Sequence, residues 1–381
     1  MAEQAKVPAI RFAGFTDPWE QRKASEVFQI VDDRGHPTLP VLSATQNQGM
    51  IYRDDSGRYI GHDESNEIGY KRVLPGDFVV HLRSFQGGFA HSQYEGITSP
   101  AYTVFRAKEP TSHSDRFWKH WFMSEHFIAG LSTVTYGIRD GRSISVDEFM
   151  NTFLAFPAVE EQAAISRLFD YLDDLITLHQ RKYDKLVIFK KSMLEKMFPK
   201  DGESVPEIRF AGFTDPWEQR KFSNLTDRVS MQSSDPDLPQ VEYEDIVSGE
   251  GTLNKDLRDK EGGKTGIKFY AGDVLYGKLR PYLMNWLYPQ FNGVAVGDFW
   301  VLRATECDSS FLYRLVQTDS FQRLANVSSG SKMPRADWNL ISQSFFAVPA
   351  DYAEQRVIAK SLAELDDLIT LHQRKRLWFA K

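Results

Sequence analysis

The chain has 381 residues, of which 41% are hydrophobic, and its formal net charge is −6. This length predicts two or three domains, and the apolar share is enough to fill their cores, which excludes a disordered chain. The single cysteine, Cys307, excludes an intrachain disulfide and fits a reducing compartment. We find no apolar run typical of a signal peptide or a membrane span, so we expect a cytoplasmic protein. The acidic balance argues against a simple nucleic-acid binder, but local patches decide binding.

The first motif in the chain has the residue types of a helix start. Asp17 suits the N-cap, Pro18 suits the first helical position, and Glu20 stands where a capping box needs an acid. We expect the apolar residues before it to pack the entering chain against a helix; these are Ile10, Phe12 and Phe15. The motif is therefore predicted to be structural, without a chemical role.

A mixed α/β domain is predicted to follow. Asp77–Leu82 and Tyr102–Arg106 are rich in branched and aromatic residues after turn signals, so we expect short strands there. The apolar spacing of Phe117–Phe127 predicts an amphipathic helix.

A long helix is predicted from about Val159 to Met197. Its core-type positions recur at spacings of three and four, which is the pattern of a coiled-coil heptad. These positions are Ile165, Leu168, Leu172, Leu175, His179, Lys182, Leu186, Phe189 and Met193. Such a helix would be roughly 58 Å long at about 1.5 Å per residue. Its narrow apolar seam needs a partner helix.

The chain then repeats itself. Residues 7–23 and 205–221 match at 16 of 17 positions, and LDDLITLHQRK occupies both 172–182 and 365–375. The two offsets are 198 and 193 residues, so the chain is a tandem duplication and not a short-period solenoid. Between these anchors the halves share only a skeleton.

The second half predicts the same elements as the first. Strands are expected at Asp273–Leu275 and Phe299–Arg303, and a helix at Ser310–Leu324. A second long helix is expected from about Tyr352 to Lys381. Its core-type positions follow the same heptad spacing as in the first helix and are Ile358, Leu362, Leu365, Leu368 and His372. Antiparallel pairing of the two long helices would place the two domains at opposite ends.

The repeated lead and helix segments are nearly identical, whereas the domains between them differ. This indicates that the repeated segments of both halves contact the same kind of partner surface and that each domain contacts a different ligand. The alternative is a recent duplication whose surface loops drifted. Drift alone does not explain why the partly exposed ends stayed the same.

No motif for catalysis is found in the sequence. Gly263-Lys264-Thr265 resembles the end of a phosphate-binding loop, but Arg258 stands where the first glycine of that loop must be. No G-x-S-x-G, H-E-x-x-H or cysteine cluster occurs. The sequence therefore argues against an enzyme active site and predicts no metal site.

Two acid pairs and two histidines lie on the long helices. The acids Asp173-Asp174 and Asp366-Asp367 are interpreted as solvated or facing a partner. His179 and His372 fall on core positions, where a metal site is one interpretation. The favoured interpretation is that they set the register of the coiled coil or face a partner subunit.

Basic residues recur at equivalent loop edges of the two halves. They follow the first predicted strand and lie in the glycine-led loop before the closing Phe-Pro or Val-Pro: His81, Arg83, Arg139 and Arg142, then Lys278, Arg280, Lys332 and Arg335. Arg and Lys contact phosphates, and Arg can also bind guanine in a bidentate pair. Surface loops commonly carry such residues for solubility, but their recurrence in both halves favours DNA binding for the set.

This order of motifs resembles the specificity subunit of Type I restriction-modification systems. The resemblance covers nearly the whole chain and rests on the lead P-x-I-R-F-x-x-F-x-x-x-W-E-x-R-K at Pro8 and Pro206, the F/V-P…E-Q junctions and the helices carrying LDDLITLHQRK. It implies an α+β fold, a pseudo-twofold tandem repeat in which two mixed α/β target recognition domains are joined by two long antiparallel coiled-coil helices. The implied segments are 1–155 (lead and first recognition domain), 156–200 (central helix), 201–348 (repeated lead and second recognition domain) and 349–381 (C-terminal helix).

The resemblance also implies a non-catalytic subunit that reads a bipartite, asymmetric site on double-stranded DNA, one half per domain. The helices would act as a ruler and dock two methyltransferase subunits, and restriction subunits would join the complex. No cofactor is expected in this chain; S-adenosylmethionine would bind the methyltransferase subunits, and ATP and Mg²⁺ the restriction subunits. The expected partner-binding residues are Asp173, Asp174, His179, Asp366, Asp367 and His372.

One departure is visible. The first helix continues through Val187–Lys200, whereas the second copy stops at Lys381, so the distal helix is short or the chain is truncated, and the symmetry of the second partner site is left open. The competing class of protein is an interaction scaffold, with two protein-binding modules on a coiled-coil spacer. DNA binding that weakens steeply with salt would favour the first class over the second.

Overall fold

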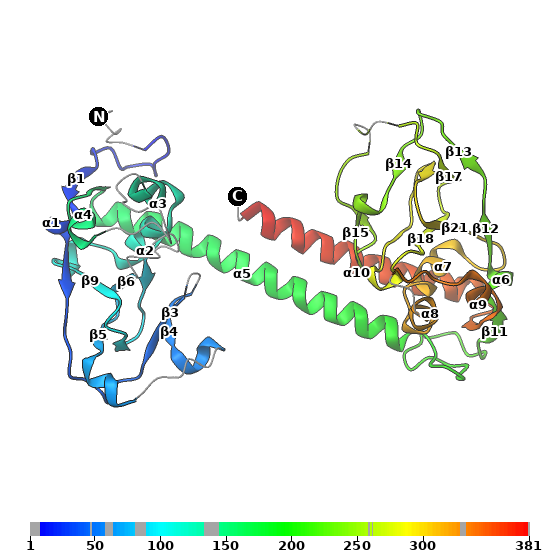
Figure 1. Cartoon of the computed structure of the whole chain (residues 1–381), viewed down its shortest axis with the longest axis horizontal. Coiled ribbons are helices and arrows are strands. Elements are labelled where there is room, and N and C mark those ends of the chain that lie inside the picture. Colours follow the sequence, from blue (N-terminus) through cyan, green and yellow to red (C-terminus); the bar gives the residue numbers. More distant parts are fainter. Residues whose placement is uncertain are drawn as a thin grey trace. The chain divides into compact units, whose positions relative to one another are not determined.

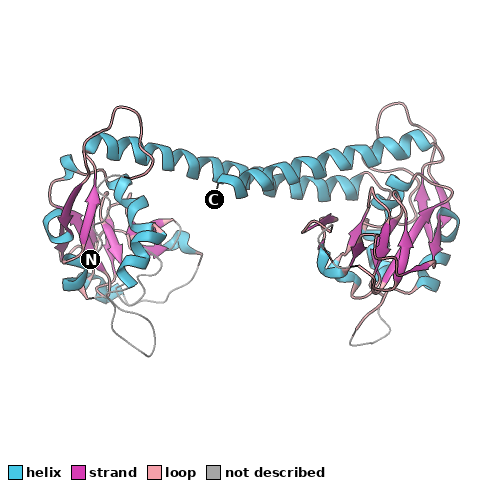
Figure 2. Ribbon diagram, turned by 90° about the horizontal axis from the view of Figure 1, so that it is seen from above, coloured by secondary structure: helices cyan, strands magenta, loops and turns pink. Residues whose placement is uncertain are grey.

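The structure is a computed structural model of the chain (Figure 1). The residues it describes are 8–45, 48–57, 64–80, 89–132, 145–257, 260, 262–327 and 333–379. The chain divides into two compact units, Met1–Asp174 and Leu175–Lys381. Each unit combines strands and helices (Figure 2), so the predicted mixed character is confirmed. Helix α5 (Val159–Lys196) begins in the first unit and ends in the second. Among the described helices, none is long and apolar enough to cross a membrane.

The first unit is built around a four-stranded antiparallel sheet. Its strand order is β2 (Phe28–Val31), β9 (Thr103–Ala107), β6 (Phe78–Val80) and β7 (Ala90–His91). Along β6, Phe78 and Val80 face one core, and Val79 faces a second core on the other side. Successive side chains of a strand point to opposite faces, so a strand covered on both faces is apolar throughout.

Helices cover one face of this sheet, and short strand pairs cover the other. The helices supply an aromatic core and are α2 (Asp115–Met123), α3 (Glu125–Ser132) and α4 (Val146–Met150). The strand pairs are β3 (Leu42–Thr45) with β4 (Gly49–Tyr52) and β5 (Lys71–Val73) with β8 (Gly96–Thr98).

The second unit repeats this plan with other residues. Its first sheet has the order β12 (Thr226–Val229), β21 (Phe299–Ala304), β18 (Val274–Gly277) and β19 (Trp286–Leu287). The covering helices are α7 (Ser309–Leu315), α8 (Asp319–Ala325) and α9 (Trp338–Gln343). A second sheet has the order β13 (Gln232–Ser233), β17 (Gly266–Phe269), β20 (Gly293–Ala295) and β14 (Gln240–Val241), and β15 (Ile246–Val247) pairs with β16 (Thr252–Leu253).

The predicted strands are confirmed in both units as far as the residues are described, since positions 81 and 82 of Asp77–Leu82 lie outside them. The two predicted covering helices are each broken into two. Ser124 separates α2 from α3, and its hydroxyl accepts a hydrogen bond from the backbone N–H of Phe127. Thr318 separates α7 from α8 and caps Phe321 in the same way. A Ser or Thr hydroxyl satisfies a free N–H at a helix start, so it begins a new helix where the apolar pattern alone predicts a continuous one.

The helix start predicted at Asp17–Glu20 is wrong. Glu20 opens strand β1 (Glu20–Lys23), which pairs antiparallel with β10 (Phe153–Phe156), and α1 (Ala24–Val27) begins only afterwards. The repeated lead behaves alike: β11 (Glu218–Lys221) pairs with β22 (Phe345–Val348) and precedes α6 (Phe222–Leu225). Pairing with a distant strand satisfies the backbone groups that the capping pattern would have satisfied locally.

The apolar lead residues also differ from the expectation. Ile10 is 91% exposed, and Phe12 is exposed as well. The packing residue of the lead is instead Trp19, whose ring meets Phe117 and Trp121 at centroid distances of 6.2 and 6.1 Å.

The arginine of each repeated I-R-F motif binds the glutamate of an E-Q motif and so joins each lead to a long helix. Arg11 donates through Nε and Nη2 to both carboxylate oxygens of the buried Glu161, at 2.9 and 2.6 Å. In the second copy Arg209 donates through Nε and Nη2 to the two carboxylate oxygens of Glu354, at 2.7 and 2.8 Å. Paired arginine–carboxylate bonds of this kind fix geometry as well as adding energy.

The glutamine of each E-Q pair ties the same helix start to the domain. Gln162 accepts from the backbone N–H of Ser114 at 2.9 Å and donates to the carbonyl of Pro157 at 2.8 Å. Gln355 does the same with Asp308 and Pro349, at 2.7 Å each. The near-identical frames are therefore two copies of one junction between a long helix and its domain.

Within the second unit, α10 (Tyr352–Phe379) runs antiparallel to the last part of α5. Lys190 Nζ lies 2.6 Å from Asp366, and His179 Nδ1 lies 2.8 Å from His372 Nδ1. Phe379 stacks on His179 with ring centroids 5.7 Å apart. Apolar side chains of both helices join the core of the second unit, namely Met193, Leu194, Ile358, Leu362 and Leu365, and Met197 joins it directly after α5.

The predicted seam is correct in part. Four of its positions are exposed: Leu168, Lys182, Phe189 and Leu368. Tyr183 and Lys190 are half-buried instead of Lys182 and Phe189, and Ile369 is buried instead of Leu368. A straight helix has 3.6 residues per turn, so a strict seven-residue pattern drifts off the buried face along its length.

Candidate nucleic-acid interface

Three of the eight predicted DNA-binding residues lie within the described chain, and the structure brings these three together. They come from two segments, the 278–284 loop after β18 and residues 333–336 before α9. Leu279 and Arg335 form an antiparallel bridge. The Arg280 N–H donates to the carbonyl of Pro334 at 2.7 Å, and the Ala336 N–H donates to that of Lys278 at 2.8 Å. The other five predicted residues, His81, Arg83, Arg139, Arg142 and Lys332, lie outside the described residues.

One carboxylate organises this basic site. Lys278 Nζ lies 3.5 Å from Asp298 Oδ1, and Arg335 Nη2 donates to Asp298 Oδ2 at 3.0 Å. Tyr243 Oη donates to the Asp298 carbonyl at 2.6 Å and accepts from the Leu279 N–H at 3.0 Å. Burial raises the pKa of Tyr243 to about 12, so its phenol stays protonated and able to donate.

Arg280 differs from its two basic neighbours. In the described part of the structure, its guanidinium has no acid partner, so the site carries three cations to one carboxylate. Its backbone lies in the left-handed region, at φ 49° and ψ 62°. That region is unfavourable for a residue with a Cβ and persists only where the surroundings hold it. The loop therefore presents, on a fixed backbone, a guanidinium that no described acid neutralises.

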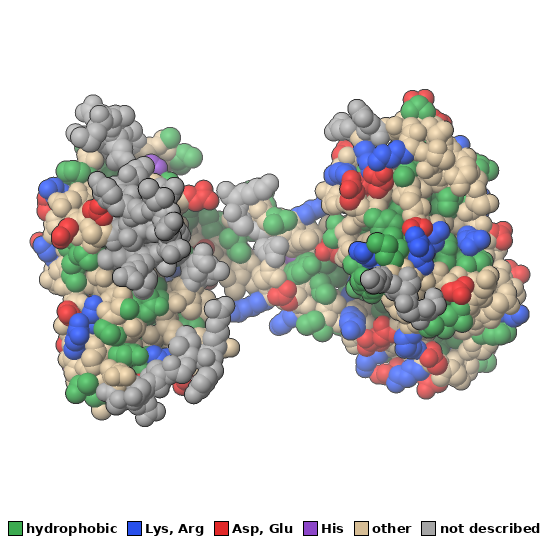
Figure 3. Space-filling view, in the orientation of Figure 1, with side chains coloured by type: hydrophobic (Ala, Val, Ile, Leu, Met, Phe, Trp, Pro, Cys, Tyr) green, Lys and Arg blue, Asp and Glu red, His purple; other side chains and the backbone are tan. Residues whose placement is uncertain are grey.

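Sequence reasoning missed the apolar part of this loop. Tyr282, Leu283 and Met284 are exposed directly after Arg280. Figure 3 shows Lys and Arg side chains beside exposed hydrophobic groups on one face of the second unit. The available signal was the run R-P-Y-L-M, which places apolar residues in a loop without strand alternation.

Most of the predicted partner-binding residues make contacts within the chain. His179 and His372 bind each other, and burial lowers the pKa of both imidazoles. Asp366 binds Lys190 and also accepts from Arg314 at 2.6 Å. Asp174 and Asp367 are exposed, and Asp173 lies 3.4 Å from Lys119. A role of these six residues in partner binding stays a prediction.

Asp173 also belongs to a cluster with His120 and Asp170 in which the donor atoms lie close enough for a metal ion. Asp170 already contacts Arg116 at 3.1 Å and Lys119 at 3.5 Å. These two cations neutralise the carboxylates on which a metal would depend, so we assign no metal to the cluster.

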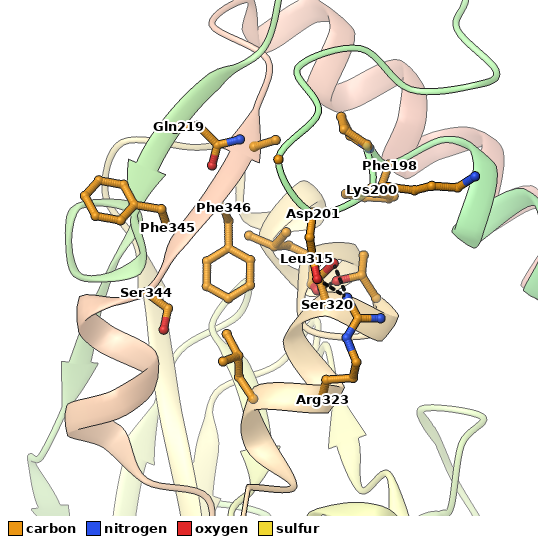
Figure 4. Close-up of a pocket in the computed structure, with 15 residues that line it drawn as sticks. Phe198, Lys200, Asp201, Gln219, Leu315, Ser320, Arg323, Ser344, Phe345 and Phe346 are labelled. Carbon is orange, nitrogen blue, oxygen red and sulfur yellow. Dashed lines mark hydrogen bonds and ion pairs between the residues drawn. The ribbon is translucent and has the colours of Figure 1, made fainter.

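A pocket of about 350 Å³ lies elsewhere in the second unit (Figure 4). It is enclosed by the segment after α5, by α8 and by β22, and on one side Arg323 and Ser320 contact Asp201. The three DNA-binding candidates that the structure describes do not line it. The pocket is therefore separate from the basic site.

A matched pair of exposed phenylalanines was also missed. Phe153 on β10 is 59% exposed and Phe345 on β22 is 58% exposed. They pair in register with Lys23 and Lys221, and the Lys221 ammonium lies 5.8 Å from the Phe345 ring centroid. The signal was available, because both runs before the closing proline begin with phenylalanine.

Comparison with known proteins shows what this chain is similar to. The chain is similar to the Type I restriction enzyme EcoDI specificity subunit of Escherichia coli, with 26% identity over 177 residues that cover 44% of this chain and 39% of that protein. It is also similar to the MjaVIII specificity subunit of Methanocaldococcus jannaschii, with 20% identity over 253 residues that cover 60% of this chain and 58% of that protein. The matches thus span less than two thirds of the length of these relatives. No protein-family model matches the chain.

The fold is also similar to that of a solved structure. The crystal structure of the Type I restriction-modification S subunit from M. genitalium matches with a TM-score of 0.56 at 11% identity, covering 99% of this chain and 96% of that one. The chain is therefore similar to Type I specificity subunits in sequence and in fold, and the resemblance predicted from the motifs is confirmed.

Proposed function

We propose that this chain is the DNA-recognition subunit of a Type I restriction-modification complex. The observation that carries the proposal is the meeting of Lys278, Arg280 and Arg335 in one basic site, where the described residues supply one carboxylate, Asp298, in contact with Lys278 and Arg335. A surface with more cations than acids attracts phosphates, and binding releases the counterions of DNA. A guanidinium on a fixed backbone suits the two acceptors of guanine in the major groove. The names of the curated relatives support the same role.

We further propose a bipartite, asymmetric target. The two units share one strand order around different loops, which supports one half-site per unit. Residues 1–155 and 201–348 then act as recognition domains, and the helices of 156–200 and 349–381 set the spacing. Replacing residues 24–155 with the same segment of another recognition domain should change only one half of the target. A change in both halves of the mapped methylation motif would contradict the modular proposal.

In this proposal the chain docks two copies of a methyltransferase subunit, and restriction subunits complete the complex. The two copies of the helix junction and the matched exposed Phe153 and Phe345 support one partner bound twice. Catalysis, S-adenosylmethionine, ATP and Mg²⁺ belong to the partner subunits.

The proposal is tested by mapping adenine methylation in the source genome with the gene intact and with it deleted. Loss of one split, asymmetric motif is expected. Persistence of every motif, in cells that express the complex, would refute the proposal and favour an interaction scaffold.

The basic site is tested with Arg280→Ala in the purified complex. Loss of one base-specific bidentate contact should weaken DNA binding by about 1–3 kcal/mol. The matched control is Arg356→Ala, which removes an exposed arginine from α10 and should leave DNA affinity unchanged. A folded Arg280→Ala variant with unchanged affinity would remove this residue from the site.

A further inference from the structure

The 281–284 turn is an exposed apolar tip on the second unit. Tyr282, Leu283 and Met284 are 54%, 38% and 43% exposed, while Pro281 at the base of the turn is buried. Large apolar side chains are normally buried in a folded domain, and a contiguous exposed group of them marks a contact site. The tip is therefore a candidate contact surface of three neighbouring apolar side chains.

The turn is held rigidly in an unfavourable conformation. Arg280 and Met284 flank it with φ values of 49° and 54°, and among the described residues they are the two with positive φ that are not glycine. Within the turn, the N–H groups of Leu283 and Met284 donate to the carbonyls of Arg280 and Pro281, at 2.9 Å each. Strained residues that are held in this way concentrate at functional sites.

Two neighbouring segments anchor the turn from outside. The Gly249 N–H donates to the Met284 carbonyl at 2.9 Å, and the Arg280 N–H donates to the Pro334 carbonyl at 2.7 Å. The tip thus keeps its shape before any ligand binds, which lowers the entropy lost on binding.

The charges around the tip identify the occupant. Arg280 immediately precedes it, Arg335 and Lys278 lie across the bridge, and Met333 adds a further exposed apolar side chain. Duplex DNA offers a matching surface, with phosphates along the groove edges and apolar base faces between them. A protein partner would need an apolar patch ringed by acids.

We propose that the 281–284 turn inserts between two base pairs of the half-site that the second unit reads, and bends the duplex there. Apolar side chains that insert between base pairs partly unstack the step and bend the duplex. Lys278 and Arg335 contact the phosphates on either side of the opened step, and Arg280 reads the base edges beside it. This inference rests on the proposed function and adds a part to it, which is recognition through the deformability of a base step.

The test uses the complex of the full chain with its methyltransferase subunit and a duplex carrying the mapped motif, labelled at both ends for energy transfer. The double variant Tyr282→Ser/Met284→Asn removes the apolar tip, and asparagine tolerates the left-handed backbone at position 284. Tyr282→Ser alone is the milder variant, should the double variant fail to fold. Met231→Ser, at another exposed apolar position of the second unit, is the matched control.

Wild type and the control are expected to bring the duplex ends closer together. The tip variants should leave the duplex straight and bind roughly 5- to 100-fold more weakly, the range for lost stacking on bases. The dependence of their affinity on salt should stay unchanged, because all three cations remain.

Folded tip variants that bend DNA as wild type does would overturn the wedge and leave the proposed function standing. So would a wild-type complex that binds with steep salt dependence but leaves the duplex straight. A wild-type complex that does not bind the duplex would overturn the proposed function and the wedge together. Capture of a protein by wild type but not by the tip variants, with DNA bending retained, would assign the tip to that protein instead.

Discussion

The Arg209–Glu354 pair gives a sharp test of the helix junction. Glu354 is 2% exposed, and it accepts two bonds from Arg209 and one from Trp217 Nε1 at 3.2 Å. Arg209→Met keeps much of the side-chain volume but leaves the carboxylate charged and buried. Breaking a buried pair in this way typically costs about 3–5 kcal/mol, and we expect the lower end, about 3 kcal/mol, because Trp217 still donates.

The assay is thermal unfolding of the second unit. A loss of about 3 kcal/mol should lower its Tm by about 6–12 °C, since 1 kcal/mol corresponds to about 2–4 °C for a unit of this size. Hydrogen exchange should locate the loss in the lead around Arg209 and at the start of α10, which the pair joins. The double variant Arg209→Met/Glu354→Leu removes both charges and should recover most of the stability, because an apolar pair of similar volume is often neutral there.

The comparison of single and double variants can refute the reasoning. If the double variant is no more stable than Arg209→Met, then the uncompensated carboxylate is not the source of the loss. The junction would then depend on the shape of the two side chains and not on their charges.

Two further predictions concern the frame and the helices. Phe153→Ser and Phe345→Ser should each weaken capture of the proposed methyltransferase partner by the purified chain, and the double variant should weaken it most. Equal capture by all variants would show that these rings do not contact that partner. Burial lowers the pKa of His179 and His372 in the folded state, so the unfolded chain binds more protons below its ordinary histidine pKa of about 6.5. The pairing of α5 and α10 should therefore be fully stable above that pH and lose stability as the pH falls through it. Thermal unfolding between pH 5 and 7.5 should show this slope in wild type and a smaller slope in His372→Gln, and equal slopes would remove the histidine pair as the cause.

Several features of the fold and site could be predicted from the sequence because their signals are local or directly repeated. The duplicated letters by themselves established two copies of one frame. Helical spacing located α5 and α10, and branched or aromatic runs located β6, β9, β18 and β21. The equivalent positions of basic residues in the two halves drew attention to Lys278, Arg280 and Arg335, and the structure brings these three together.

Other features were decided only by the tertiary structure, because they join residues far apart in the chain. The letters at Asp17–Glu20 fit a helix cap, but pairing with Phe153–Phe156, more than 130 residues away, makes Glu20 part of a strand. The partner of Arg11 lies 150 residues away, at Glu161. Asp298 lies at the centre of the basic site although no local pattern distinguishes it from other surface acids. Propensity and periodicity act over a few residues, whereas strand register and buried charge pairs are selected by the packing of the whole unit.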